Sequence, residues 1–121
     1  MASPNQGSPI KGEVSSADAT SPGVTLLLYP AGSATAITLG ATEFLTITDF
    51  WFNTTAALDV YLAASTDAAG KRIFKGSYEA LGGIGMNLSV PITCPMGVTP
   101  VLIADGAGQV DLTLTGYITK A

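Results

Sequence analysis

Short runs of alternating apolar and polar residues, each ending at a turn signal, constrain this chain most. In residues 110–115, VDLTLT, the apolar side chains take every second position, which is the period of a half-buried strand. No run repeats at the helical period over the length a helix needs. The runs predict about eight strands at spacings of eight to twelve residues, so we expect an all-β, antiparallel β-sandwich. They cover residues 24–29, 34–39, 43–52, 58–62, 71–78, 86–92, 101–104 and 110–118. Eight strands favour a jelly-roll-like fold over a seven-stranded immunoglobulin-like sandwich. The paired cysteines of an immunoglobulin domain are also missing.

Residues 43–62, EFLTITDFWFNTTAALDVYL, are the densest apolar stretch and hold the single Trp of the chain. They predict two strands joined as a hairpin through the turn at 53–57. The alternation slips at Asp49, and Phe50, Trp51 and Phe52 follow in a row, which indicates a bulge or a strand covered on both faces. Asp49 shares the parity of the apolar residues before it. It is therefore a candidate buried acid, and we expect backbone amides at the bulge to satisfy it.

Residues 1–22 differ in composition from the rest, with Pro4, Pro9 and Pro22 spread through a segment rich in Ser, Gly and Ala. Such a segment buries too little apolar surface to offset its ordering entropy. We expect a flexible or extended N-terminal arm (1–22) followed by a β-sandwich domain (23–121). Ile10 and Val14 are its sizeable apolar side chains and the predicted anchors on a partner surface. The alternative is a plain flexible tail.

Charged residues make up only 12% of the chain, and the net charge is −4. Nucleic acid is excluded as a partner, because phosphate binding needs clustered Lys and Arg. So few charges leave a monomer poorly solvated. Either a small-residue β protein tolerates this, or copies of the chain or a larger assembly cover the surface. The second interpretation predicts a homotrimer, with five candidate interface residues: Phe50, Trp51, Phe52, Leu27 and Tyr29.

Catalytic chemistry is hard to build from this sequence, which has no His and one Cys. A Ser-His-Asp or Cys-His arrangement is impossible within the chain, and so is a zinc site of the usual ligands. We expect no enzyme activity, metal or cofactor, and a buried structural thiol at Cys94. A carboxylate-based hydrolase would need two acids in one cleft. A carbohydrate-binding module would use Trp51, Tyr61 and Asn53, because aromatic rings stack on sugars.

Targeting signals are missing as well. The N-terminal residues lack the apolar core of a signal peptide, and no apolar run approaches the length of a membrane-spanning helix. We expect a protein that is made in the cytoplasm and does not bind membranes.

The second half of the chain carries a particular order of glycines and strands. It runs through Gly76, LGG at 81–83, VPI at 90–92, Gly97, VLIA at 101–104 and GQVDLTLTGY at 108–117. This order resembles small β-sandwich virion proteins of tailed bacteriophages, namely capsid decoration or cement proteins and the head domains of fibres. The resemblance covers about residues 44–118. It implies a structural role in the virion, a trimer, an N-terminal extension that grips the capsid, and the major capsid protein or another virion protein as partner. The alternative function is a carbohydrate-binding module or a receptor-binding adhesin head.

Overall fold

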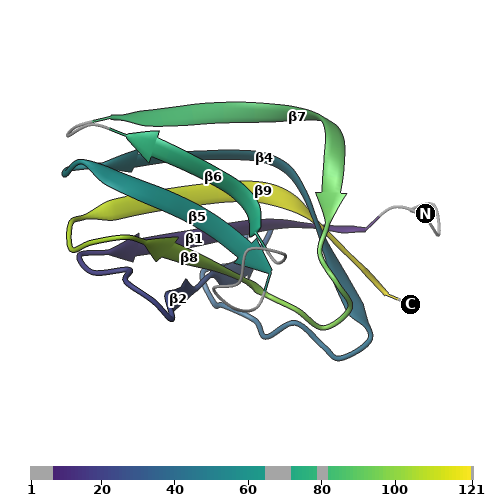
Figure 1. The fold of residues 1–121 in the computed structure, drawn as a ribbon. Coiled ribbons are helices and arrows are strands. Elements are labelled where there is room, and N and C mark those ends of the chain that lie inside the picture. The colour runs from purple at the N-terminus through teal and green to yellow at the C-terminus, as the bar shows by residue number, and fades with distance from the viewer. Residues whose placement is uncertain (1–6, 65–71, 79–81, 121) are drawn as a thin grey trace.

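The computed structural model describes residues 7–64, 72–78 and 82–120. These residues form two antiparallel sheets packed face to face, so the predicted all-β sandwich is confirmed (Figure 1). The five-stranded sheet has the order β3 (Leu27–Pro30), β1 (Ser8–Ser16), β9 (Val110–Lys120), β4 (Glu43–Thr54) and β7 (Gly83–Thr93). The four-stranded sheet has the order β2 (Val24–Thr25), β8 (Pro100–Ala104), β5 (Leu58–Ala64) and β6 (Arg72–Tyr78). The first six residues of the predicted arm, the predicted loop at 65–70, Lys71 and Leu81 lie outside the described residues.

The strand pairing is nested, as in a jelly roll. β1 pairs with β9, β2 with β8, β4 with β7 and β5 with β6, and every pair is antiparallel. This is the pattern of one long antiparallel ribbon rolled into two sheets. The short strand β3 adds a fifth member beside β1. The jelly-roll-like prediction is therefore confirmed, and β7, which contains Pro91, is an edge strand of the five-stranded sheet.

The predicted hairpin at residues 43–62 is wrong in its pairing, although both of its strands exist. β4 belongs to the five-stranded sheet and β5 to the four-stranded sheet, so the turn carries the chain across the sandwich. The turn at 105–109 does the same between β8 and β9. Alternation shows which side chains face the core, and that face is the same whether the next strand pairs or crosses over.

The separate arm is also wrong for residues 8–16, because β1 lies inside the five-stranded sheet between β3 and β9. The segment after it is held to the sandwich as well, since the carbonyls of Ala17 and Ala19 accept hydrogen bonds from the amides of Gly108 and Ala104. Ile10 and Val14 are buried in the protein's own core, with 4% and 5% of their surface exposed. They therefore cannot anchor the chain on a partner. Between them Gly12 faces inward, and the side chains of Leu114 and Leu26 occupy the space that its own side chain would need. Neighbouring strands supply the apolar surface that this segment lacks.

Residues 24–39 also differ from the prediction. The expected strand at 24–29 is split into β2 and β3, and the buried Leu26 lies where the chain passes from one sheet to the other. Residues 34–39 form no strand. They make a single bridge between Leu28 and Ile37, and the segment is otherwise a loop along the edge of β3.

A bulge in β4 explains the run of aromatic residues. Ile47 pairs with Gly116 of β9 and Asp49 with Thr115, which leaves Thr48 as an extra residue. The extra residue resets the alternation, so that Phe50 and Phe52 face the core and Trp51 faces outward. The rings of Phe50 and Phe52 both contact Phe74 of the opposite sheet edge-on, with ring centroids 4.9 and 5.6 Å apart.

Candidate functional site

The outer face of the five-stranded sheet holds Trp51, whose side chain is 47% exposed. Across the sheet it lies in one row with Gly85 of β7 on one side and Thr113 of β9 on the other. The same row continues through Glu13 to Leu27, which is 52% exposed. Neighbouring strands are about 4.8 Å apart, so Trp51 and Leu27 lie about 14 Å from each other with polar residues between them.

The next row holds Asp49, which pairs with Thr115 of β9 and Asn87 of β7. Its Oδ2 accepts hydrogen bonds from the hydroxyls of Thr48 and Thr115 at 3.0 and 3.1 Å. The expected backbone amides are therefore replaced by threonine hydroxyls. Asp49 is half-buried on the outer face, because the bulge at Thr48 changes its side. Its Oδ1 accepts no hydrogen bond from the described part of the chain.

These two rows form a shallow surface hollow. Its lining consists of Asp49, Phe50, Trp51, Gly85, Asn87 and Thr115. We call this feature the Trp51 hollow. It combines an exposed indole, a carboxylate with a free oxygen and an exposed amide. The sequence predicts a binding role for the indole alone and marks Asp49 as a buried acid. It does not predict a role for Asn87 in this hollow, because only the fold determines which residue Asn87 faces across the sheet.

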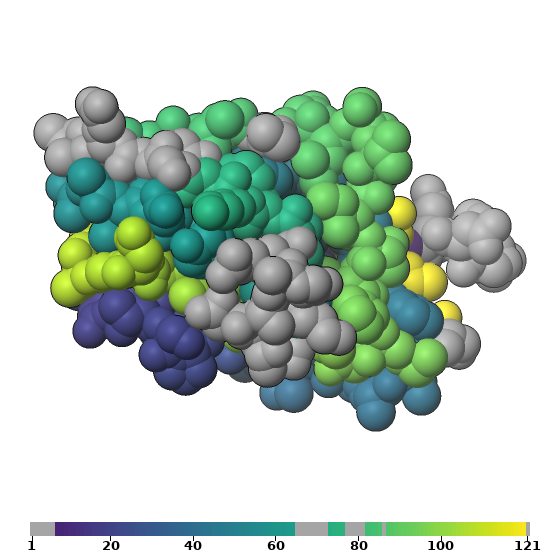
Figure 2. All heavy atoms as spheres, viewed as in Figure 1, coloured from purple at the N-terminus to yellow at the C-terminus, as the bar shows by residue number. Residues whose placement is uncertain are grey.

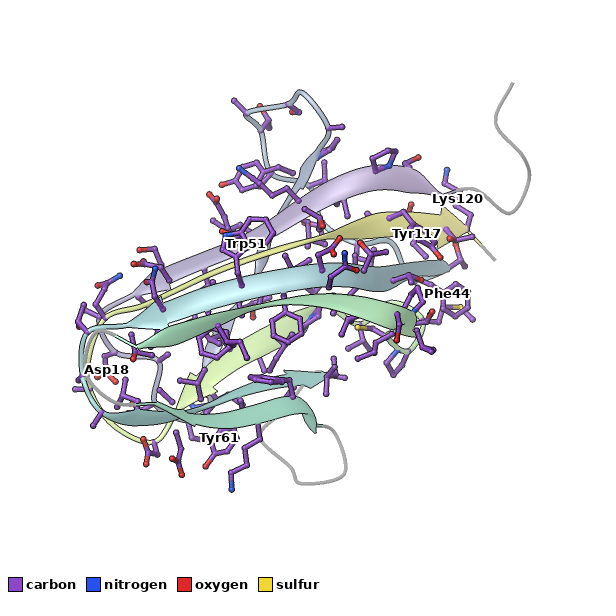
Figure 3. The ribbon with its side chains drawn as sticks, turned by 90° about the horizontal axis from the view of Figure 1, so that it is seen from above. Asp18, Phe44, Trp51, Tyr61, Tyr117 and Lys120 are labelled. Carbon is purple, nitrogen blue, oxygen red and sulfur yellow. The ribbon has the colours of Figure 1, made fainter. Side chains whose placement is uncertain are left out.

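The predicted sugar-binding set is not brought together. Tyr61 projects from β5 on the opposite side of the sandwich from Trp51 (Figure 3). The ammonium of Lys75 lies 5.5 Å from the centre of the Tyr61 ring. Asn53 shares the outer face of β4 with Trp51, two residues further along, and pairs with Asp111 and Gly83.

The predicted interface residues divide into two groups. Phe50 and Phe52 are buried between the sheets, so the prediction that they contact another subunit is wrong. Their burial follows from the bulge, which aligns them with the inward positions of β9. Trp51 and Leu27 are exposed, and Tyr29 is half-buried with the Lys11 ammonium 5.3 Å from its ring centre.

A second surface lies at the end of the sandwich where β1 begins and β9 ends. It consists of loop 31–42, the corner of β7 at 88–91 and the turn at 94–99, none of which contains a charged residue. The corner arises because four residues of β7 stand against the single Thr48 of β4. The turn at 94–99 and loop 31–42 touch at Gly97 and Ala41. Figure 2 shows the turn, in light green, against the loop, in blue. We call this surface the charge-free end.

Each of these segments carries one exposed apolar side chain: Ile37, Val90 and Met96. Ile37 lies opposite Leu28 beyond β3, at the other edge of the five-stranded sheet from β7, so it does not share a patch with Val90. Val90 is the most exposed, at 77%. The adjoining acid, Glu43, accepts a hydrogen bond from the Gly40 amide through its carboxylate at 2.6 Å. Lys120, the last residue of β9, pairs with Glu43 across the sheet, so two charged residues adjoin this surface. Exposed apolar side chains with few neighbouring charges are typical of the centre of a protein interface.

One cleft near β1 and β2 does gather two acids, Glu13 and Asp111. Each acid already has partners. Lys11 lies 3.3 Å from the Glu13 carboxylate, and Asp111 accepts hydrogen bonds from the Ser15 hydroxyl and the Gln109 amide. The Ser15–Asp111 hydrogen bond ties β1 to β9, and both acids have partners, so we interpret the pair as structural.

Cys94 is buried as predicted, with 2% of its surface exposed. Burial raises the pKa of its thiol to about 11, so the thiol stays protonated at neutral pH. Among residues 7–64, 72–78 and 82–120, no three potential metal-ligating side chains come together. The same residues contain no helix long and apolar enough to cross a bilayer. No protein-family model, curated protein or solved structure matches this chain.

Proposed function

We propose that this protein is a non-enzymatic structural component of a bacteriophage virion, a capsid decoration or cement protein that binds and stabilises the capsid as a homotrimer. The resemblance in the order of glycines and strands motivates this proposal. The jelly-roll sandwich agrees with it, because its rigid core leaves most of the surface free for contacts.

The observation that carries the proposal is the charge-free end. Its exposed apolar side chains would be poorly placed on a protein that stays in solution. Burying Val90 alone against a partner stabilises a complex by about 1.5–3 kcal/mol. The partner we propose is the major capsid protein or another virion protein that offers a matching uncharged surface.

The proposed trimer contact involves Leu27 and Tyr29 on β3. Phe50 and Phe52 take no part in it, because they belong to the core. β3 is a short strand at the edge of the five-stranded sheet. A closed ring of three subunits would bury the same patch on each. Light scattering of the protein in solution at micromolar concentration should give three times the monomer mass. Leu27→Asp should reduce this mass.

Capsid binding is tested by sedimentation with heads purified from a phage in which the gene is deleted. Purified protein should pellet with the heads, and Val90→Asp and Met96→Asp should weaken this binding at least tenfold. Trp51→Asp is the matched control, because Trp51 is as exposed as Met96 but lies on the outer face of β4, away from the charge-free end. Failure of the wild-type protein to pellet at micromolar concentration would overturn the proposal.

A carbohydrate-binding module or adhesin head remains the second candidate function. The exposed indole of Trp51 favours it, since an aromatic face at the surface suits sugar stacking. A carbohydrate-binding module should bind glycans on an array, whereas the capsid-binding role requires no glycan binding. The two functions depend on different surfaces of the molecule.

A further inference from the structure

We propose that the Trp51 hollow binds a neutral saccharide. One sugar ring stacks on the indole of Trp51, and its hydroxyls bind Asp49 and Asn87. This inference rests on the second candidate function and names its site and ligand class. It does not depend on capsid binding, which is proposed for the charge-free end.

The indole is open to a flat ligand because its neighbours across the sheet are small. Gly85 of β7 has no side chain, and a Cβ placed there would lie 3.5 Å from the Cβ of Trp51. Beyond Gly85 the sheet ends, because β7 is an edge strand. On the other side stands Thr113, a short side chain. A ring can therefore approach the aromatic face from the direction of β7, where no taller side chain stands opposite Trp51.

Asp49 is a prepared hydrogen-bond acceptor. The Thr115 hydroxyl donates to Oδ2, and the Thr48 hydroxyl is shared between Oδ2 and the Thr115 carbonyl oxygen, so both contacts orient the carboxylate from the same side. Oδ1 is left available, and an ionised carboxylate can accept several hydrogen bonds. A group that is already oriented loses little entropy when a ligand binds. A sugar hydroxyl is a donor of the right kind for this oxygen.

Asn87 adds a donor and an acceptor beside the carboxylate. It pairs directly with Asp49 across the sheet, and its side chain is exposed. Trp51 is two residues from Asp49 on the same face of β4, which places the indole about 7 Å along the strand. This spacing allows one sugar ring to cover the indole while its hydroxyls contact the carboxylate and the amide.

The charge of the hollow selects neutral ligands. Its lining contains Asp49 and no cationic residue. The nearest cation in this row is Lys11, two strands from Asp49 and thus about 10 Å away. Lys11 also lies 3.3 Å from the Glu13 carboxylate. At physiological salt, charges about 8 Å apart are already largely screened, so Lys11 cannot offset the repulsion between Asp49 and an acidic sugar.

The test is a glycan array that carries neutral, sialylated and sulfated glycans, probed with the full-length protein. The best-binding glycan is then titrated by calorimetry against the wild type and variants. Trp51→Ala and Asp49→Asn should each weaken binding at least tenfold. Thr25→Ala is the control, because Thr25 is exposed on β2 of the other sheet, outside both the hollow and the proposed trimer contact. Since Trp51 is the single Trp, its fluorescence also reports binding directly in the wild type and in Asp49→Asn.

The expected result is binding to neutral glycans that both hollow variants lose and the Thr25 control keeps, with thermal melting unchanged in all three variants. An array with no binder of any kind overturns the inference and the second candidate function together, whereas binding of acidic glycans alone overturns the inference and leaves that function standing. Binding that survives in Trp51→Ala and is lost in Tyr61→Ala overturns only the site. Equal binding of sialylated glycans overturns the assigned ligand class.

Discussion

Replacing Ile10 and Val14 by alanine tests whether β1 belongs to the core. Ile→Ala substitutions in a core cost about 2–5 kcal/mol. Val14→Ala removes two methyl groups, which is worth roughly 1.6 kcal/mol before any cavity is counted. The two residues are four apart on one strand, a separation of about 13 Å, so their effects should add. We therefore expect the double variant to lose about 4–7 kcal/mol of unfolding free energy.

A domain of this kind is stable by about 5–15 kcal/mol, so this loss is large. Urea unfolding followed by circular dichroism should show it as a midpoint lower by about 2–3.5 M, for a slope of about 2 kcal/mol/M. The control is Lys11→Ala with Glu13→Ala on the exposed face of the same strand, where the ion pair contributes at most about 1 kcal/mol. A double variant of Ile10 and Val14 with an unchanged midpoint would refute the assignment of β1 to the core and restore the idea of a separable arm.

Two further predictions concern packing and the thiol. Gly116→Ala should destabilise the protein by more than about 3 kcal/mol in a urea titration, because the added Cβ collides with the Thr46 carbonyl oxygen, while Gly85→Ala, which has room, should change stability by less than about 1 kcal/mol. Cys94 should resist thiol reagents at pH 8 until the protein is unfolded. The native state keeps the Cys94 proton up to about pH 11 and the unfolded chain releases it near 9.0, so stability should fall between these values by about 1.4 kcal/mol per pH unit. A Cys94→Ala variant should lack this part of the decline, and an equal decline in both proteins would contradict the linkage.

Much of the strand content follows from the sequence, because alternation reports directly on which face is buried. The last strand is the clearest case, with Val110, Leu112 and Leu114 all buried in β9. The phase slip near Asp49 likewise marked a real bulge. These features depend on local side-chain order, which a single sequence displays.

The errors arise where the answer depends on distant strands. β1 has only two large inward side chains, and its burial relies on Leu114 and Leu26 filling the space above Gly12. The crossing turns at 53–57 and 105–109 have the composition of hairpin turns, and nothing local shows that the chain changes sheets. The Trp51 hollow was only partly foreseen for the same reason, since Gly85 and Asn87 come beside Trp51 and Asp49 through pairing across the sheet.

Because β1 pairs with β9, the first strand to be synthesised cannot pair with this neighbour until the last strand has been synthesised. Ser8 lies opposite Ile118, so roughly a hundred residues must be synthesised before β1 has its partner. At about 5–20 residues per second this delay lasts about 5–20 seconds, during which the apolar side of β1 is uncovered. Pairings so distant in sequence also slow folding. Because the start of β1 and the end of β9 are neighbours, a short linker joining them, with new ends in the turn at 53–57, would make the most distant pairing of the sheet a local hairpin. Such a circular permutant should refold faster than the natural order while keeping the same two sheets.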